Sequence, residues 1–270
     1  MAGRLHGADW GIALRVLPVV AVAVGTKLVV DQLGWDVVEL NPLHSGLVAA
    51  NVFLIGFLLA GTLSDYKESE RLPGELAARA ETIGDECQIL YRDTGAEPAL
   101  GCMEHLKGFA DDVLAWLRGA ASVDVPLQRI EDLNHWFLAF QPLTQPNFIV
   151  RLKQEQSALR LLVIRINTIK ETSFVGAGYL IAELTSVLLL IALVIADIDS
   201  LGVELFLIGA ITFLLAYMIL LIKDMDDPFD HDHRGRRGTV EVSLAPLEHL
   251  QRRMAEEAHA LAGEAPDRPA

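Results

Sequence analysis

Four apolar segments, each long enough to form a helix that crosses a lipid bilayer, constrain the fold of this chain more than any other feature. They run over residues 10–30, 46–63, 173–196 and 205–222, and a bilayer core requires about 20 largely apolar residues per helix. The second lies within an uncharged stretch from Ser45 to Ser64. Backbone polar groups in lipid must find partners within their own segment, so each segment is predicted to be α-helical. The sequence therefore predicts an all-α membrane protein with four transmembrane helices.

The charged residues of the first segment are predicted to reach the membrane surface. Arg15 and Lys27 lie near its two ends, where a long side chain can keep its methylene stem in lipid and extend its charged head to the interface. Pro18 predicts a kink in the same helix. No small-residue cleavage site follows, so we expect a membrane helix and not a removed signal peptide.

Two intramembrane polar residues have more than one interpretation. Glu183 lies near mid-depth of the third segment, close to Thr185 and Ser186. Charge in lipid is costly unless it is paired or hydrated, so Glu183 is either a protonated or paired carboxyl that holds helices together or a group that faces an aqueous path. Asn51 in the second segment presents a similar choice, and an amide that bonds a neighbouring helix is the commoner case.

Basic residues near the ends of the apolar segments indicate the orientation. The connections 31–44 and 197–204 contain no Lys or Arg. The remaining ends are flanked by Arg4, Lys67, Arg71, Arg165, Lys170 and the residues from Lys223 through Arg237. Because Lys and Arg are enriched on the cytoplasmic side, both termini and residues 64–172 are predicted to be cytoplasmic. We expect a multi-pass protein of the cell (inner) membrane, with the lipid bilayer as a partner.

The long cytoplasmic region is predicted to be a bundle of amphipathic helices. Apolar residues recur at steps of three and four, the period of one helix face, in four stretches at about 76–90, 103–117, 125–140 and 147–169. Each stretch has one apolar stripe that requires a covering partner. A further amphipathic helix is expected over 245–262.

The chain thus divides into four predicted regions. These are an N-terminal segment with transmembrane helices 1 and 2 (1–63), a cytoplasmic helical region (64–172), transmembrane helices 3 and 4 (173–222), and a cytoplasmic tail (223–270).

Composition and motifs exclude several classes of function. With 36 acidic and 22 basic side chains the net charge is −14, which argues against nucleic acid as a partner, since phosphate binding requires an excess of Lys and Arg. Cys87 and Cys102 form no metal spacing and are expected to be buried thiols. No phosphate-binding glycine loop or hydrolase motif is present, and the His231–Asp–His233 run is too short to hold a metal alone. No enzymatic activity, metal or cofactor is predicted.

Two short motifs resemble those of a known family. The stretch NVFLIGFLLAGTLSDYKESERLP, residues 51–73, resembles the second, pore-lining helix of bestrophin-type channels, which carries the pattern F-x-x-G-F. The stretch DMDDPFD, residues 224–230, resembles the acidic-Pro-Phe motif that ends the last membrane helix of that family. A weaker likeness, over residues 7–20, is to the start of the first membrane helix. The order of two spans, a cytoplasmic helical region, two spans and a tail also matches.

The resemblance implies a function and a set of site residues. Phe53 and Phe57 would face a pore and form its neck, Ala49 would lie one turn before them, and Gly56 would allow tight packing behind. Residues 49, 53 and 57 share one helix face. Rings of phenylalanine from several subunits make an apolar neck that can gate by dewetting, and their positive ring edges tolerate anions. The implied protein is a homo-oligomeric, pentameric ion channel for chloride or other small anions.

Other functions remain open from the sequence. The acidic balance of the chain would attract cations, so a cation channel is one alternative. A non-conducting membrane scaffold is another, and it predicts that Phe53 and Phe57 pack against helices of their own subunit. A transporter that uses Glu183 is the third, although the internal repeats common in transporters are not seen.

Overall fold

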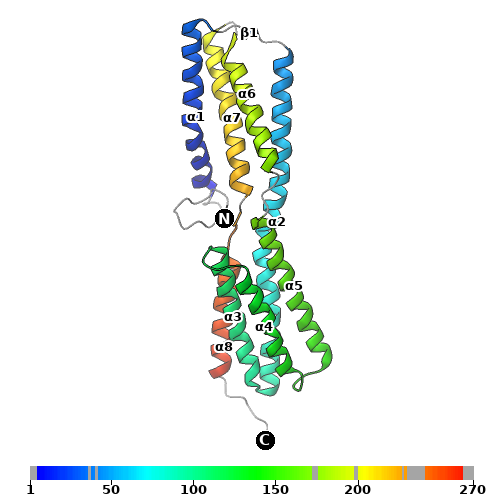
Figure 1. Cartoon of the computed structure of the whole chain (residues 1–270). Helices are drawn as coiled ribbons and strands as arrows, with labels where there is room; N and C mark the ends of the chain where they lie inside the picture. Colours follow the sequence, from blue (N-terminus) through cyan, green and yellow to red (C-terminus); the bar gives the residue numbers. More distant parts are fainter. Residues whose placement is uncertain are drawn as a thin grey trace. The chain divides into compact units, whose positions relative to one another are not determined.

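The computed structural model of the chain describes residues 5–35, 38–39, 42–171, 176–197, 200–226, 228–229 and 241–263. Within these ranges the chain is almost entirely helical (Figure 1). The helices are α1 (Leu5–Leu33), α2 (Pro42–Thr94), α3 (Glu97–Leu117), α4 (Asp124–Phe140), α5 (Pro146–Glu171), α6 (Gly176–Val194), α7 (Leu201–Asp226) and α8 (Ala245–Gly263). The predicted all-α class is therefore confirmed for the described residues.

Helix α2 is longer than the sequence indicates. It runs for 53 residues without a break, so the predicted boundary between residues 63 and 64 falls inside a continuous helix. The change from apolar to charged residues alters the surroundings of the helix, but it does not interrupt the backbone hydrogen bonds. One side of α2 is buried along most of its length, at positions 51, 55, 58, 62, 69, 72, 76, 80, 83, 87 and 90. Their spacing of three, four or seven residues shows that the helical phase is continuous.

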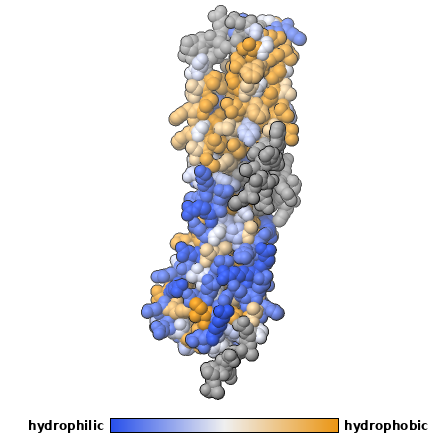
Figure 2. Space-filling view, turned by 180° about the vertical axis from the view of Figure 1, so that it is seen from behind, coloured by the Kyte–Doolittle hydropathy of each residue, from blue (hydrophilic) through white to orange (hydrophobic). Residues whose placement is uncertain are grey.

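The described residues form two compact units. The apolar unit consists of α1, α2 up to Tyr66, α6 and α7, and the polar unit consists of α2 from Lys67, α3, α4, α5 and α8. On the face shown in Figure 2, hydrophobic residues dominate the first unit and hydrophilic residues dominate the second. The core of the apolar unit is formed by Ile55, Leu58, Ala182, Leu189, Leu193, Ile208, Leu215 and Ile222.

Among the residues that the structure describes, three helices are long and apolar enough to cross a membrane. Their qualifying stretches are Gly11–Leu33, Ser45–Thr94 and Leu201–Asp226, and a shorter apolar helix covers Gly178–Val194. Much of their surface remains apolar, since Val22, Leu188 and Phe206 are 68%, 60% and 72% exposed. Such a surface requires lipid or another apolar partner around it.

The loops of the apolar unit include one feature that the sequence does not signal. Two short strands, β1 (Val38–Glu39) and β2 (Ala196–Asp197), pair in parallel. Two-residue strands are too short to give an alternating hydrophobic pattern. The pairing joins the connection that follows α1 to the connection that follows α6.

The polar unit is a helical bundle with a well-filled core. Leu76, Ile83, Met103, Leu106 and Phe140 are each fully buried. The ends of three helices lie within a few residues of the predicted stretches, namely α4, α5 and α8. Helix α3 begins earlier than predicted, at Glu97. Pro98 explains that start, because proline is favoured in the first turn of a helix.

Ion pairs connect the helices of this bundle across its surface. Arg79, Arg151 and Arg165 join α2 and α5 through Glu155, Glu86 and Glu68 respectively. Arg253 of α8 pairs with Glu81 and Asp85 of α2. Each pair is partly solvated and contributes little alone; together they fix which helix faces meet.

Candidate functional site

One face of α2 is left uncovered by the rest of the apolar unit. We call the exposed residues Ala49, Phe53, Phe57, Ala60 and Ser64 the outer face of α2. The side chains of Phe53 and Phe57 are 76% and 65% exposed. Large aromatic rings normally fill a core, and these two fill none within this chain.

Gly56 lies beside the two phenylalanines and is also exposed. A Cβ atom built at Gly56 would have no atom of this chain within 4 Å. The described helices of this chain therefore do not pack closely against Gly56.

Asn51 lies on the opposite, buried side of α2. Its Nδ2 donates a hydrogen bond to Ser186 Oγ at 3.0 Å, and Thr185 Oγ1 donates one to Asn51 Oδ1 at 2.7 Å. Asn51 is 2% exposed, so its amide bonds the neighbouring helix α6. These bonds set the rotation of α2 and direct the phenylalanines away from the core.

Glu183 is paired with a basic residue. Its carboxylate forms an ion pair with Lys223 of α7, and both side chains remain substantially exposed, at 40% and 49%. Of the two interpretations open from the sequence, this geometry agrees with a carboxyl that holds two helices together.

A buried ion pair that sequence reasoning missed joins α1 and α7. Lys27 is fully buried, and its Nζ lies 3.0 Å from Glu204 Oε2. The same Nζ donates a hydrogen bond of 2.6 Å to the carbonyl of Ala196. The expectation that Lys27 reaches the membrane surface is thus wrong, because a carboxylate and a carbonyl satisfy the ammonium group inside the protein. The available signal was that Lys27 and Glu204 lie at segment ends predicted on the same side of the membrane.

The described residues offer no centre for metal chemistry. No group of three or more His, Cys, Asp or Glu side chains in these ranges could hold a metal ion, and His231 and His233 lie outside them. Cys87 and Cys102 are free and buried, as predicted, and burial and the neighbouring Cys87 thiol raise the pKa of Cys102. Thiols in such surroundings are poor nucleophiles.

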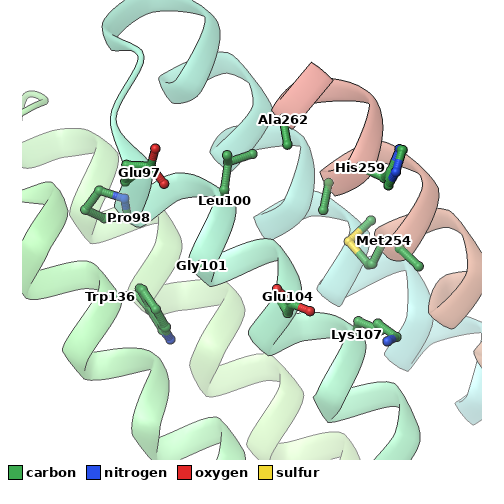
Figure 3. Close-up of a pocket in the computed structure, with 12 residues that line it drawn as sticks. Glu97, Pro98, Leu100, Gly101, Glu104, Lys107, Trp136, Met254, His259 and Ala262 are labelled. Atoms are coloured by element: carbon green, nitrogen blue, oxygen red, sulfur yellow. The ribbon is translucent and has the colours of Figure 1, made fainter. Parts of the chain in front are cut away.

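A hollow in the polar unit lies between α3, α4 and α8 (Figure 3). Its volume is about 730 Å³. Trp136 packs directly over Gly101, and Met254 lies on the α8 side. The remaining wall consists mainly of Glu97, Leu100, Glu104, Lys107 and alanines of α8. This hollow lacks a buried polar group that would orient a ligand.

Comparison with known proteins identifies the fold. No family profile and no curated protein sequence matches this chain. A solved structure of a bacterial bestrophin homologue from Klebsiella pneumoniae superposes with a TM-score of 0.71 at 15% identity, over 94% of this chain and 98% of that one. A substituted variant of that homologue gives 0.71 at 15% identity over 95% and 99%. A variant described as a membrane protein gives 0.73 at 15% identity over 92% and 98%.

These likenesses extend over nearly the whole chain, so the bestrophin-type fold predicted from two short motifs is confirmed. At 15% identity they concern the fold alone, and the roles of individual residues have to be argued from their own surroundings.

Proposed function

We propose that this protein is an oligomeric, bestrophin-like ion channel that conducts chloride or other small anions through a neck lined by Phe53 and Phe57. The observation that carries the proposal is the outer face of α2, where both rings are exposed on the side opposite the hydrogen-bonded Asn51. A chain that only needed to bury these rings could have placed them in its own core.

The neck follows from symmetry and from the shape of the side chain. When several copies place α2 around one axis, each contributes a phenylalanine at two levels about one helical turn apart. The resulting constriction is apolar and can gate by dewetting. Ala49 precedes the rings at a wider level, and Gly56 leaves room for a neighbouring copy to approach. The pentamer implied by the family resemblance is our working stoichiometry.

The channel is proposed to lie in the cell (inner) membrane with both termini in the cytoplasm. The support is the basic flanks of the apolar segments, together with helices of suitable length and composition. Lipid, small inorganic ions and further copies of the same chain are then its partners, and no enzymatic role is proposed.

The rival functions fit the geometry less well. A non-conducting scaffold predicts that Phe53 and Phe57 pack within their own subunit, whereas both are largely exposed. A transporter that uses Glu183 requires a carboxyl free to exchange protons or ions, whereas this one is paired with Lys223. Cation conduction remains the second candidate, because a net charge of −14 favours cations near the protein.

Ion flux from liposomes tests the proposal. Purified wild type and the Phe53→Ala/Phe57→Ala variant would be compared under separate chloride and sodium gradients. Phe206→Ala provides the matched control, since this phenylalanine is 72% exposed on α7. We expect wild-type flux that changes in rate or gating in the double variant and not in the control. Absence of flux from both wild type and variants, over several pH and calcium conditions, would favour the scaffold.

A further inference from the structure

We propose that Lys67 sets the charge selectivity of the pore, as one positive charge per subunit at the cytoplasmic end of the outer face of α2. This inference rests on the proposed channel function and extends it from the neck to the residue that selects the sign of the ion.

The position of Lys67 follows from the continuity of α2. The helix runs unbroken from Pro42 to Thr94, and residues 53, 57, 60, 64 and 67 recur at steps of three and four, so they share one face. All five are exposed. The buried residues Thr62 and Ser69 keep the opposite side of the helix facing its own chain on both sides of this position. Lys67 lies about 15 Å along the helix axis from Phe57, at 1.5 Å per residue.

Lys67 is also the first charge on this face. The chain is uncharged from Ser45 to Ser64. Asp65, at about 100° from Ser64, lies to the side of the face, whereas Glu68, four residues after Ser64, lies on it next to Lys67. Glu68 is occupied by Arg165, whose guanidinium donates two hydrogen bonds of 2.7 Å to its carboxylate.

The charge of Lys67 is not compensated by its own chain. Among the residues that the structure describes, its ammonium group has neither an ion-pair nor a hydrogen-bond partner. Arg71, the next basic residue on the face, differs, because it bonds Glu75 at 3.0 Å. An uncompensated ammonium on an exposed helix face is available to mobile anions.

A ring of Lys67 side chains, one from each subunit, would allow a channel with an acidic net charge to conduct anions. Selection depends on the potential inside the pore more than on the net charge, because exposed charges farther away than about 10 Å are screened at 0.1 M salt. Like charges lining a confined path can raise the local concentration of counter-ions by about 10- to 1,000-fold. We therefore expect Lys67 to outweigh the acidic side chains that lie more than about 10 Å from it.

The test is the reversal potential of channels in planar bilayers under a chloride salt gradient. Wild type would be compared with Lys67→Gln, Lys67→Glu and Lys67→Arg. Lys107→Gln is the matched control, since it removes one lysine charge from α3 and not from α2. We expect the chloride-to-sodium permeability ratio to fall several-fold in Lys67→Gln, to fall further or reverse in Lys67→Glu, and to stay unchanged in Lys67→Arg and Lys107→Gln.

A chemical version avoids any dependence on how the variants fold. Lys67→Cys would be assembled into bilayers and then treated with a thiol reagent carrying either an ammonium or a sulfonate group. The native thiols Cys87 and Cys102 are buried. The cationic reagent should restore anion preference and the anionic reagent should abolish it.

The outcomes separate this inference from the function beneath it. Conducting channels whose permeability ratio is the same in wild type, Lys67→Glu and both modified cysteine forms would overturn the role of Lys67 and leave the channel intact. A wild type that carries no current at all would overturn the proposed function itself.

Discussion

At the scale of single residues, the buried ion pair between Lys27 and Glu204 gives the clearest prediction about the stability of the protein. Both groups lie almost entirely out of solvent, so removal of one partner breaks an ion pair inside the protein. Lys27→Met is expected to destabilise the protein by about 3–5 kcal/mol, measured as a lower thermal midpoint in detergent.

The double variant Lys27→Met/Glu204→Met is the control for that prediction. It removes both charges and replaces them with apolar groups of similar length, so it should recover most of the lost stability. A double variant less stable than Lys27→Met alone would contradict the account, since the loss would then come from packing and not from the broken ion pair.

A second residue-scale prediction concerns pH. Burial lowers the pKa of His105 below its usual value, although a hydrogen bond to the Arg129 carbonyl at 2.8 Å opposes the shift. The unfolded chain therefore takes up a proton at higher pH than the folded one. Stability is fully present above an unfolded pKa of about 6.5 and falls as the pH drops through the folded pKa.

The free energy of unfolding of the full chain, measured between about pH 7.5 and about pH 5, tests this prediction. These buffer conditions bracket about 6.5, the usual pKa of histidine. His105→Gln should flatten the pH dependence, whereas His249→Gln, at an exposed position on α8, should preserve it. An equal effect of the two substitutions would show that general charge, and not the buried His105, controls the response.

The candidate site was only partly predictable at this scale. The spacing of Phe53 and Phe57 indicates a shared face, but a sequence cannot tell an exposed face from a buried one when both are apolar. The hydrogen bonds of Asn51 decide that question. The Lys27–Glu204 pair was missed because its partners are 177 positions apart by their numbers and meet only when α1 and α7 pack.

At the scale of elements, the contact between α2 and α8 leads to a third prediction. A Cβ atom at Gly84 would lie 2.8 Å from Met254 Sδ. Gly84→Ala is tolerable, because a methionine side chain can move, but Gly84→Leu would overfill the contact and cost about 1–3 kcal/mol. In Gly84→Leu we expect faster proteolysis of α8 than in the wild type. Mass spectrometry of the fragments measures this.

Gly74→Leu is the matched control on the same helix. A Cβ at Gly74 has no atom within 4 Å, and leucine is a better helix former than glycine. The control should therefore leave the proteolysis pattern unchanged. If both leucine variants released α8 equally, the close contact with Met254 would not be what holds it.

The elements themselves were largely predictable, for physical reasons that differ between them. Amphipathic stripes identify α3, α4, α5 and α8, because each helix covers one apolar face with its neighbours. The continuity of α2 was not predictable from hydropathy, which reports the surroundings of a helix and not its hydrogen bonding. The β1–β2 pair has too few residues to leave a periodic pattern.

At the scale of the whole molecule, fold and assembly are specified in different ways. This chain shares the bestrophin-type fold with structures at 15% identity. Helix lengths, apolar stripes and two short motifs were sufficient to indicate that fold. Assembly depends on which exposed surfaces meet other copies, and a surface that meets lipid and one that meets another copy are both apolar. An exposed phenylalanine toward lipid and one toward a symmetry axis look the same in a single chain.

Cross-linking between copies distinguishes these two cases and gives the last prediction. If the outer face of α2 converges on an axis, cysteines at Ala60, one turn beyond Phe57, come close enough between neighbouring copies to form a disulfide, which needs Cα atoms within about 7 Å. Ala60→Cys should then give covalent dimers on mild oxidation in membranes. Leu188→Cys, on an exposed face of α6, should not if that face meets lipid. The buried native thiols leave the background unchanged. Dimers from Leu188→Cys and none from Ala60→Cys would place α6 at the contact between copies and leave the phenylalanines facing lipid, in which case the neck would have to be abandoned.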